Sequence, residues 1–195
     1  MTTKVKEKKI NHPKLFNDRI KKEESLGFIK ILLKEFPKLE LYLVGGMVRD
    51  IILNTPNSKD FDFVARNIEL KDLITSLNKL GWCDLTGRDF GVIKFKPRES
   101  TGFIDIALPR SEKAEMTGGY RDFTLQVDKK LALEKDLARR DLTINAMAWD
   151  INNSKLIDPF HGQDDLENKL IRAVGTPEKR FQEDYSRILR AIRFA

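Results

Sequence analysis

The stretch LYLVGGMVRD, residues 41–50, followed by DFDFV, residues 60–64, decides the fold. Its first apolar residues indicate a buried strand, the paired glycines a tight turn, and residues 47–53 a helix. Residues 60–64 alternate acidic and apolar side chains, which predicts a second strand. Strand, glycine turn, helix and strand in this order predict a domain of mixed α and β structure.

Apolar spacing on either side of this stretch predicts the remaining elements. Helices are expected over residues 26–36, 70–80, 133–138, 142–149 and 164–170, and strands over 91–96 and 103–108. Residues 111–124 contain a glycine pair among mixed charges and are expected to form a long mobile loop. Residues 183–195 are helical in pattern and have no terminating residue, so we expect the working protein to be longer.

Composition excludes several classes of site. The chain has one cysteine, Cys83, which excludes an internal disulfide framework, and two histidines, too few for a Cys/His zinc site. No apolar run reaches membrane-spanning length, so neither a membrane partner nor secretion is expected. We expect the protein to work in a reducing, cytoplasmic setting. The net charge of +6 and the pI near 9.3 favour a polyanionic partner without identifying it.

The lysines at the start of the chain predict that residues 1–25 are a mobile or loosely helical extension. This extension could contact RNA phosphates or act only as a solubilising tail.

Three aspartates are candidate metal ligands. Asp60 and Asp62 are two apart on a predicted strand and therefore share a face, while Phe61 points into the core. A divalent cation between such carboxylates relieves their repulsion. If the strand that carries Asp105 pairs beside them, three carboxylates converge, which is enough for two Mg²⁺ ions and an in-line displacement. The alternative is a solvated edge of the sheet.

The turn between the first strand and its helix is a candidate phosphate site. Gly45 and Gly46 let the backbone approach a phosphate, and Arg49 can contact a triphosphate oxygen. Glycine pairs also occur in plain turns, but this one lies just before the aspartate pair. Further along, Arg140 could hold phosphate or ribose oxygens and Asp141 could accept from a ribose hydroxyl. Alternatively, Asp141 only caps a helix beside surface arginines.

The last predicted helix is a candidate base-reading element. Asp184, Arg187 and Arg190 are three apart and share a face, while Arg193 lies well round it. Aspartate offers acceptors and arginine donors, whereas cytosine and adenine each present an amino donor beside a ring-nitrogen acceptor. One Asp–Arg pair could therefore accept C and A and reject G and U, leaving the third residue for phosphate or base. The alternative is a helix salt bridge with solvated arginines.

Together these segments resemble the class II tRNA nucleotidyltransferase and bacterial poly(A) polymerase family over residues 41–195. The motifs that carry the resemblance are LVGGMVRD (43–50), DFD (60–62), ALPRSEK (107–113), RRDLTINAMA (139–148), LIDPFHGQDDL (156–166) and EDYSRILRAIRFA (183–195). The resemblance implies a polymerase-β-like nucleotidyltransferase head over 26–150, a small mixed sheet flanked by helices. It also implies the start of an all-helical neck over 151–195.

The resemblance also implies roles. Asp60 and Asp62 would bind Mg²⁺, with Asp105 at the position of the family's additional carboxylate. The family's nucleotide-binding positions fall on Gly46, Arg49, Arg140, Arg190 and Arg193, and its base-selecting pair on Asp184 and Arg187. The loop after Asp105 resembles the flexible element tied to the switch from C to A addition.

The implied activity is addition of CCA to the 3′ end of tRNA from CTP and ATP, with release of pyrophosphate. A poly(A) polymerase, a CC-only or A-only enzyme, and a non-catalytic RNA- or nucleotide-binding module remain alternatives. Two departures from the family matter. Tyr185-Ser186 replaces its common Pro-Leu, and residues 1–195 do not include the segments with which the family binds the rest of the tRNA. The sequence favours no particular oligomeric state.

Overall fold

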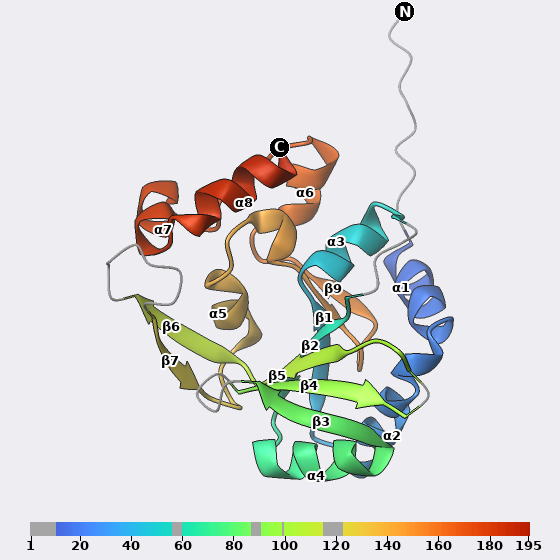
Figure 1. Ribbon diagram of the computed structural model, residues 1–195. Helices are drawn as coiled ribbons and strands as arrows, with labels where there is room; N and C mark the ends of the chain where they lie inside the picture. The colour runs from blue at the N-terminus through green and yellow to red at the C-terminus, as the bar shows by residue number, and fades with distance from the viewer. Residues whose placement is uncertain (1–10, 56–59, 87–90, 99, 115–122) are drawn as a thin grey trace, which may run out of the picture.

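A seven-stranded mixed sheet organises the part of the chain that the computed structural model describes, residues 11–55, 60–86, 91–98, 100–114 and 123–195. Its strand order is β3-β4-β5-β2-β1-β8-β9 (Figure 1). The strands are β1 Glu40–Val44, β2 Asp62–Arg66, β3 Gly81–Thr86, β4 Val92–Pro97, β5 Ile104–Ala107, β8 Ala148–Asp150 and β9 Lys155–Ile157. With helices around it, this sheet confirms the predicted α+β class.

Helices pack on the sheet and lie beside it (Figure 1). They are α1 His12–Lys21, α2 Phe28–Glu35, α3 Gly46–Ile52, α4 Leu70–Leu80, α5 Leu133–Ala138, α6 Gly162–Glu167, α7 Pro177–Glu183 and α8 Ser186–Phe194, with 3₁₀ turns η1 Glu24–Leu26 and η2 Thr143–Asn145. None of the helices described has the length and apolarity that a membrane span requires.

Period-two alternation along β1 and β2 sends side chains to two cores. Leu43 and Phe63 join the larger core, which contains buried residues of α1, α2 and α4. Val44 and Val64 point to the other face and pack with residues of α5. Because β2 pairs in parallel with β5 and antiparallel with β1, one sheet face carries residues from all three strands toward α5.

The start of the chain differs from the predicted extension over residues 1–25. Residues 1–10 lie outside the described part, but α1 packs on the fold, and its Phe16 is fully buried. The Phe16 ring stacks on Trp149 of β8 with centroids 4.3 Å apart. Leu15 and Ile20 of the same helix also pack against the core, and overall composition does not reveal such an apolar face among lysines.

Residues 142–149 form the turn η2 and the strand β8 instead of the predicted helix. β8 is buried on both faces, so its side chains lack the polar–apolar alternation that marks a half-exposed strand. β8 then pairs with β9, which was not predicted, nor was β3. The sheet therefore continues to Ile157, beyond the predicted boundary between residues 150 and 151.

The predicted loop over residues 111–124 is partly a pair of strands. β6 Arg110–Ala114 and β7 Phe123–Val127 pair antiparallel in a separate two-stranded sheet. The glycine pair and the rest of residues 115–122 lie outside the described residues, and with them the centre of the expected flexible element.

The predicted helix over residues 183–195 is confirmed as α8, which begins at Ser186, whereas α7, which ends at Glu183, was not predicted. Asp184 adopts an extended backbone, φ −156° and ψ 106°, between α7 and α8. Its side chain accepts a hydrogen bond from the Ser186 backbone N–H at 2.8 Å, and its carbonyl accepts from the Arg187 N–H at 3.1 Å. Asp184 thus caps α8, which is why the helix begins there.

Candidate active site

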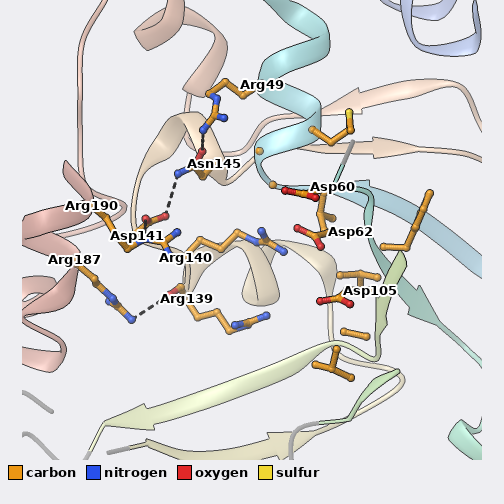
Figure 2. Close-up of a pocket in the computed structure, with 18 of the residues that line it drawn as sticks. Arg49, Asp60, Asp62, Asp105, Arg139, Arg140, Asp141, Asn145, Arg187 and Arg190 are labelled. Carbon is orange, nitrogen blue, oxygen red and sulfur yellow. Dashed lines mark hydrogen bonds and ion pairs between the residues drawn. The ribbon is translucent and has the colours of Figure 1, made fainter. Parts of the chain in front are cut away.

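A pocket of about 650 Å³ lies beside β1, β2 and β5. Every residue that the sequence singled out as catalytic or nucleotide-binding lines it: Gly45, Gly46, Arg49, Asp60, Asp62, Asp105, Arg140, Asp141, Asp184, Arg187, Arg190 and Arg193. Figure 2 shows the three metal-ligand candidates on one side, Arg187 and Arg190 on the other, and Arg140 extending between them. The pocket therefore has an acidic wall and a basic wall.

The acidic wall is built by strand pairing. Asp62 of β2 and Asp105 of β5 are register partners in the parallel pair, and Asp60 comes just before β2. Phe61 and Phe63, which alternate with these aspartates, are 3% and 1% exposed in the core. The side-chain directions predicted for this stretch are therefore confirmed.

Burial, together with two neighbouring carboxylates, changes the ionisation of Asp62. Burial raises the pKa of Asp62 to about 6; Asp105 and Asp60 act in the same direction, and Arg140 opposes them. A divalent cation would relieve this repulsion, and carboxylate oxygens are the ligands that Mg²⁺ prefers. The donor set therefore fits Mg²⁺.

A lysine of β4 lies beside the acidic wall. Among the described residues, no three acidic, cysteine or histidine side chains stand in a geometry that could hold a metal ion. Instead, the Lys94 ammonium of β4 lies 3.4 Å from an oxygen of Asp105, its register partner. Lys94 is thus a positive charge in contact with the acidic wall.

The glycine turn brings the backbone close to charged side chains. Gly45 has φ +73°, and a Cβ atom added there would lie 3.0 Å from Nη1 of Arg140 and 3.7 Å from an oxygen of Asp62. A side chain would meet both strain and crowding at this position. Glycine is needed here because backbone, guanidinium and carboxylate meet at one point.

Arg140 is a buried cation between the acidic and basic walls. Its Nη2 lies 3.7 Å from Asp136 of α5, and its Nε has no hydrogen-bond partner among the described residues although it is buried. Burial lowers the pKa of Arg140, while Asp136 and Asp62 oppose that effect; a guanidinium stays charged in proteins. Arg140 therefore presents a buried positive charge, with a spare donor, beside Asp62.

Arg49 is held on several sides. Its Nη1 donates to Oδ1 of Asn145 at 2.7 Å, and its Nε and Nη2 donate to Asp50 at 2.8 and 2.6 Å. The guanidinium also lies over the ring of Phe194, 4.7 Å from its centroid, and Arg193 lies 4.8 Å from the same ring. These contacts hold the Arg49 side chain in one position, from which it could make the predicted phosphate contact.

Arg190 has a partner, whereas the sequence left it for phosphate or base. Its Nε donates to Oδ2 of Asp141 at 2.7 Å, which joins α8 to the segment before η2. Burial acts to raise the pKa of Asp141, but Arg190 and other hydrogen bonds, including one from Asn145, hold it below its usual range. Asp141 is therefore an ionised, buried acceptor, and not the helix cap that was the alternative.

The candidate base-reading pair lies on the basic wall. Asp184 and Arg187 are each 6% exposed, with Arg187 Nε 3.9 Å from Oδ2 of Asp184. Arg187 also bonds Glu183 at 3.0 Å and the carbonyl of Arg139 at 3.5 Å. The two side chains lie together because Asp184 caps the helix that carries Arg187, not because they share a helix face.

Several lining or bridging residues were not singled out from the sequence. They are Lys94, Arg110, Arg139, Asn145 and Phe194. A signal existed for Asn145, which stands four residues after Asp141 in a stretch expected to be helical, a spacing that brings side chains together. Lys94 had none, because its approach to Asp105 depends on which strands pair.

Proteins with similar sequences carry CCA in their names. The chain is 43% identical over 157 residues to a multifunctional CCA protein of Aliivibrio salmonicida, covering 80% of this chain and 35% of that protein. It is 38% identical to a CCA-adding enzyme of Blochmanniella floridana, covering 80% and 34%. The chain thus spans about a third of the length of these curated relatives.

Solved structures with the same fold include two complexes. A Bacillus stearothermophilus CCA-adding enzyme in complex with CTP superposes with a TM-score of 0.69 at 28% identity, covering 92% of this chain and 38% of that one. A Thermotoga maritima CCA-adding enzyme complexed with tRNA-CCA gives 0.65 at 31% identity, covering 87% and 37%.

A family model places the chain. The sequence model of the Poly A polymerase head domain matches residues 41–172, more than half of the chain. That span contains the glycine turn, the three aspartates and the segment from Arg139 to Asn145. The chain therefore belongs to the Poly A polymerase head domain family.

Proposed function

We propose that this chain is the nucleotide-binding and nucleotidyl-transferring part of an enzyme that adds C and A to the 3′ end of tRNA from CTP and ATP. The observation that carries the proposal is the single pocket with an acidic and a basic wall. Relatives named CCA-adding enzymes, one in complex with CTP and one with tRNA, support it. We place its action in the cytoplasm, where these substrates are found. We divide the chain into a head that runs from α1 to β9 and the start of a neck that follows β9.

The acidic wall serves the reacting end of the RNA. Asp60, Asp62 and Asp105 are the residues that would hold two Mg²⁺ ions, which activate the attacking hydroxyl and neutralise the leaving pyrophosphate when bound. The Asp62 carboxylate itself is ionised above pH about 6, and we place it where the 3′-hydroxyl must approach. Reaction is thus expected to need deprotonated Asp62.

The glycine turn and its arginines serve the triphosphate. Gly45 and Gly46 let phosphate oxygens approach the backbone, and Nη1 of Arg140 lies next to Gly45. Arg49 adds a second guanidinium, and Arg193 lies near the same Phe194 ring as Arg49. Charge-assisted hydrogen bonds of this kind fix the phosphates while the α-phosphorus is attacked.

The basic wall chooses the nucleotide. Asp141 accepts from a ribose hydroxyl, and Asp184 with Arg187 offers an acceptor beside a donor to the base edge. C and A present the complementary pair, whereas G and U present the reverse and would leave buried polar groups unpaired.

A poly(A) polymerase is the second candidate, because the matching family is described by that activity. It shares every residue assigned here. The two candidates differ in product, since a poly(A) polymerase extends generic RNA with ATP alone.

The test is incubation of the chain with Mg²⁺, labelled CTP or ATP, and tRNA that lacks its CCA end, with products resolved to one nucleotide. Ordered addition of C, C and A is the expected result, and D62N should abolish it. Addition of A alone to generic RNA would assign poly(A) polymerase instead. If tRNA is not extended and CTP does not bind, the proposal fails.

A further inference from the structure

We propose that Asn145 is a positioning residue that couples the triphosphate side of the pocket to its ribose and base side; this rests on the proposed function. Asn145 lies on η2 and is 6% exposed. Its Oδ1 accepts from Nη1 of Arg49 at 2.7 Å, and its Nδ2 donates to Oδ1 of Asp141 at 3.4 Å. Figure 2 shows both contacts as one line from Arg49 to Asp141.

The line of contacts joins elements that are distant in the chain. Arg49 belongs to α3, which follows the glycine turn, and Asp141 is bonded in turn to Arg190 of α8. Asn145 is therefore the hydrogen-bonded link between the helix proposed to meet phosphates and the helix proposed to read the base, beside the direct contact of Arg49 with the Phe194 ring. An ordered ligand group at one end stabilises the other end through this bridge.

Only a side-chain amide makes this bridge. Its oxygen accepts from a cation while its nitrogen donates to an anion, and both partners stay charged. Leucine, of nearly the same shape, makes neither bond and leaves Arg49 to Asp50 and Asp141 to Arg190. Serine has a donor and an acceptor but is too short to reach both partners.

The first measurement is the CTP dissociation constant in Mg²⁺, by calorimetry, for wild type, N145L and N145S. Losing a bridge between two charged groups should weaken binding about tenfold in both variants. The matched control is N153L, because Asn153 also donates from Nδ2 to an aspartate, Asp150 at 2.9 Å, outside the pocket. N153L should bind CTP as wild type does.

The second measurement is a double-mutant cycle. If Asn145 had only a structural role, its substitution would not change the coupling energy that the cycle measures. R49M and D141A are combined in the wild-type and N145S backgrounds. In the wild-type background, the loss of CTP affinity in the double variant should differ from the product of the single losses by at least about threefold. In the N145S background, the two losses should multiply.

The outcomes are distinct. Equal coupling in the two backgrounds, or wild-type affinity in N145L and N145S, overturns the role of Asn145. Absence of CTP binding to wild type overturns the proposed function instead. In that case the same variants are compared by their midpoints of thermal unfolding without nucleotide, which tests the Asn145 bridge independently of the function. Coupling between Arg49 and Asp141 that disappears in the N145S background supports the bridge, and unchanged coupling refutes it.

Discussion

At the scale of single residues, the ionised carboxylate of Asp62 lowers the free energy of unfolding. The carboxyl is partly buried beside Asp105 and Asp60, and its pKa is raised to about 6, although Arg140 and Lys94 act against that rise. At neutral pH the folded chain therefore keeps a charge in a place that disfavours it. Such a conflict is common where carboxylates are gathered for chemistry.

The D62N variant should unfold less readily than wild type at neutral pH in the absence of divalent cations. The folded-state pKa lies above the ordinary value of 3.8, so the contribution of Asp62 to stability is fully present below that value and is lost as pH rises through about 6. The expected gain at pH about 8 is roughly 2 kcal/mol, vanishing near pH about 4.

Urea unfolding in EDTA across this pH range measures the gain. D84N on the exposed part of β3 is the control for loss of a carboxyl alone. Parallel stability curves for D62N and wild type would refute the conflict at Asp62.

Some site residues could be predicted from the sequence because their geometry is local. The period of two puts Asp60 and Asp62 on one face, and the glycine pair puts a turn beside them. The contacts of Lys94 with Asp105 and of Arg190 with Asp141 depend on strand order and helix docking. No local pattern encodes those contacts.

At the scale of elements, Asp184 has two tasks that can be separated. It caps α8 through its side chain and stands beside Arg187 in the pocket wall. D184N keeps the cap, since asparagine caps as well as aspartate, whereas D184A loses it and should cost about 1 kcal/mol. Both variants should lose the preference for CTP over UTP, because the acceptor-only carboxylate is gone.

Urea unfolding and nucleotide titration check these two effects independently. A D184N variant that still prefers CTP would show that Asp184 only caps the helix.

The helix α1 is expected to be part of the cooperative fold. F16A removes a fully buried ring stacked on Trp149 and should lower the free energy of unfolding by about 3 to 5 kcal/mol. K14A, on the exposed face of the same helix, should leave it nearly unchanged. Chemical denaturation followed by tryptophan fluorescence gives both values, and equal stability of F16A and wild type would mean that α1 is a dispensable extension.

The elements best predicted are those with one exposed face. The helix over residues 70–80 was predicted with its observed bounds because apolar and polar positions alternate around it. β8 was missed because both of its faces are covered, and β9 because a three-residue strand is too short to show a pattern.

At the scale of the whole molecule, α8 is joined to the rest by polar contacts. Its large apolar side chains Leu189 and Ile192 are 70% and 67% exposed, so apolar burial contributes little to holding it. The bonds from Arg190 to Asp141 and from Arg187 to the Arg139 carbonyl connect it to the pocket. The basic wall therefore depends on these bonds.

R190A should loosen α8 without unfolding the sheet. Backbone amides of α8 should exchange with deuterium at least about tenfold faster, and those of β1 at the wild-type rate. The control is R172A, which removes an ion pair with Asp165 on α6. Unchanged exchange in α8 would show that the helix is held by other contacts.

The most direct test of the account is calorimetric titration of the chain with CTP, ATP, GTP and UTP in Mg²⁺. The pocket is proposed to hold the triphosphate on the glycine turn and to read the base with Asp184 and Arg187. CTP and ATP should bind, and GTP and UTP should bind at least about tenfold more weakly. Equal binding of all four, or no binding of CTP and ATP, would contradict it.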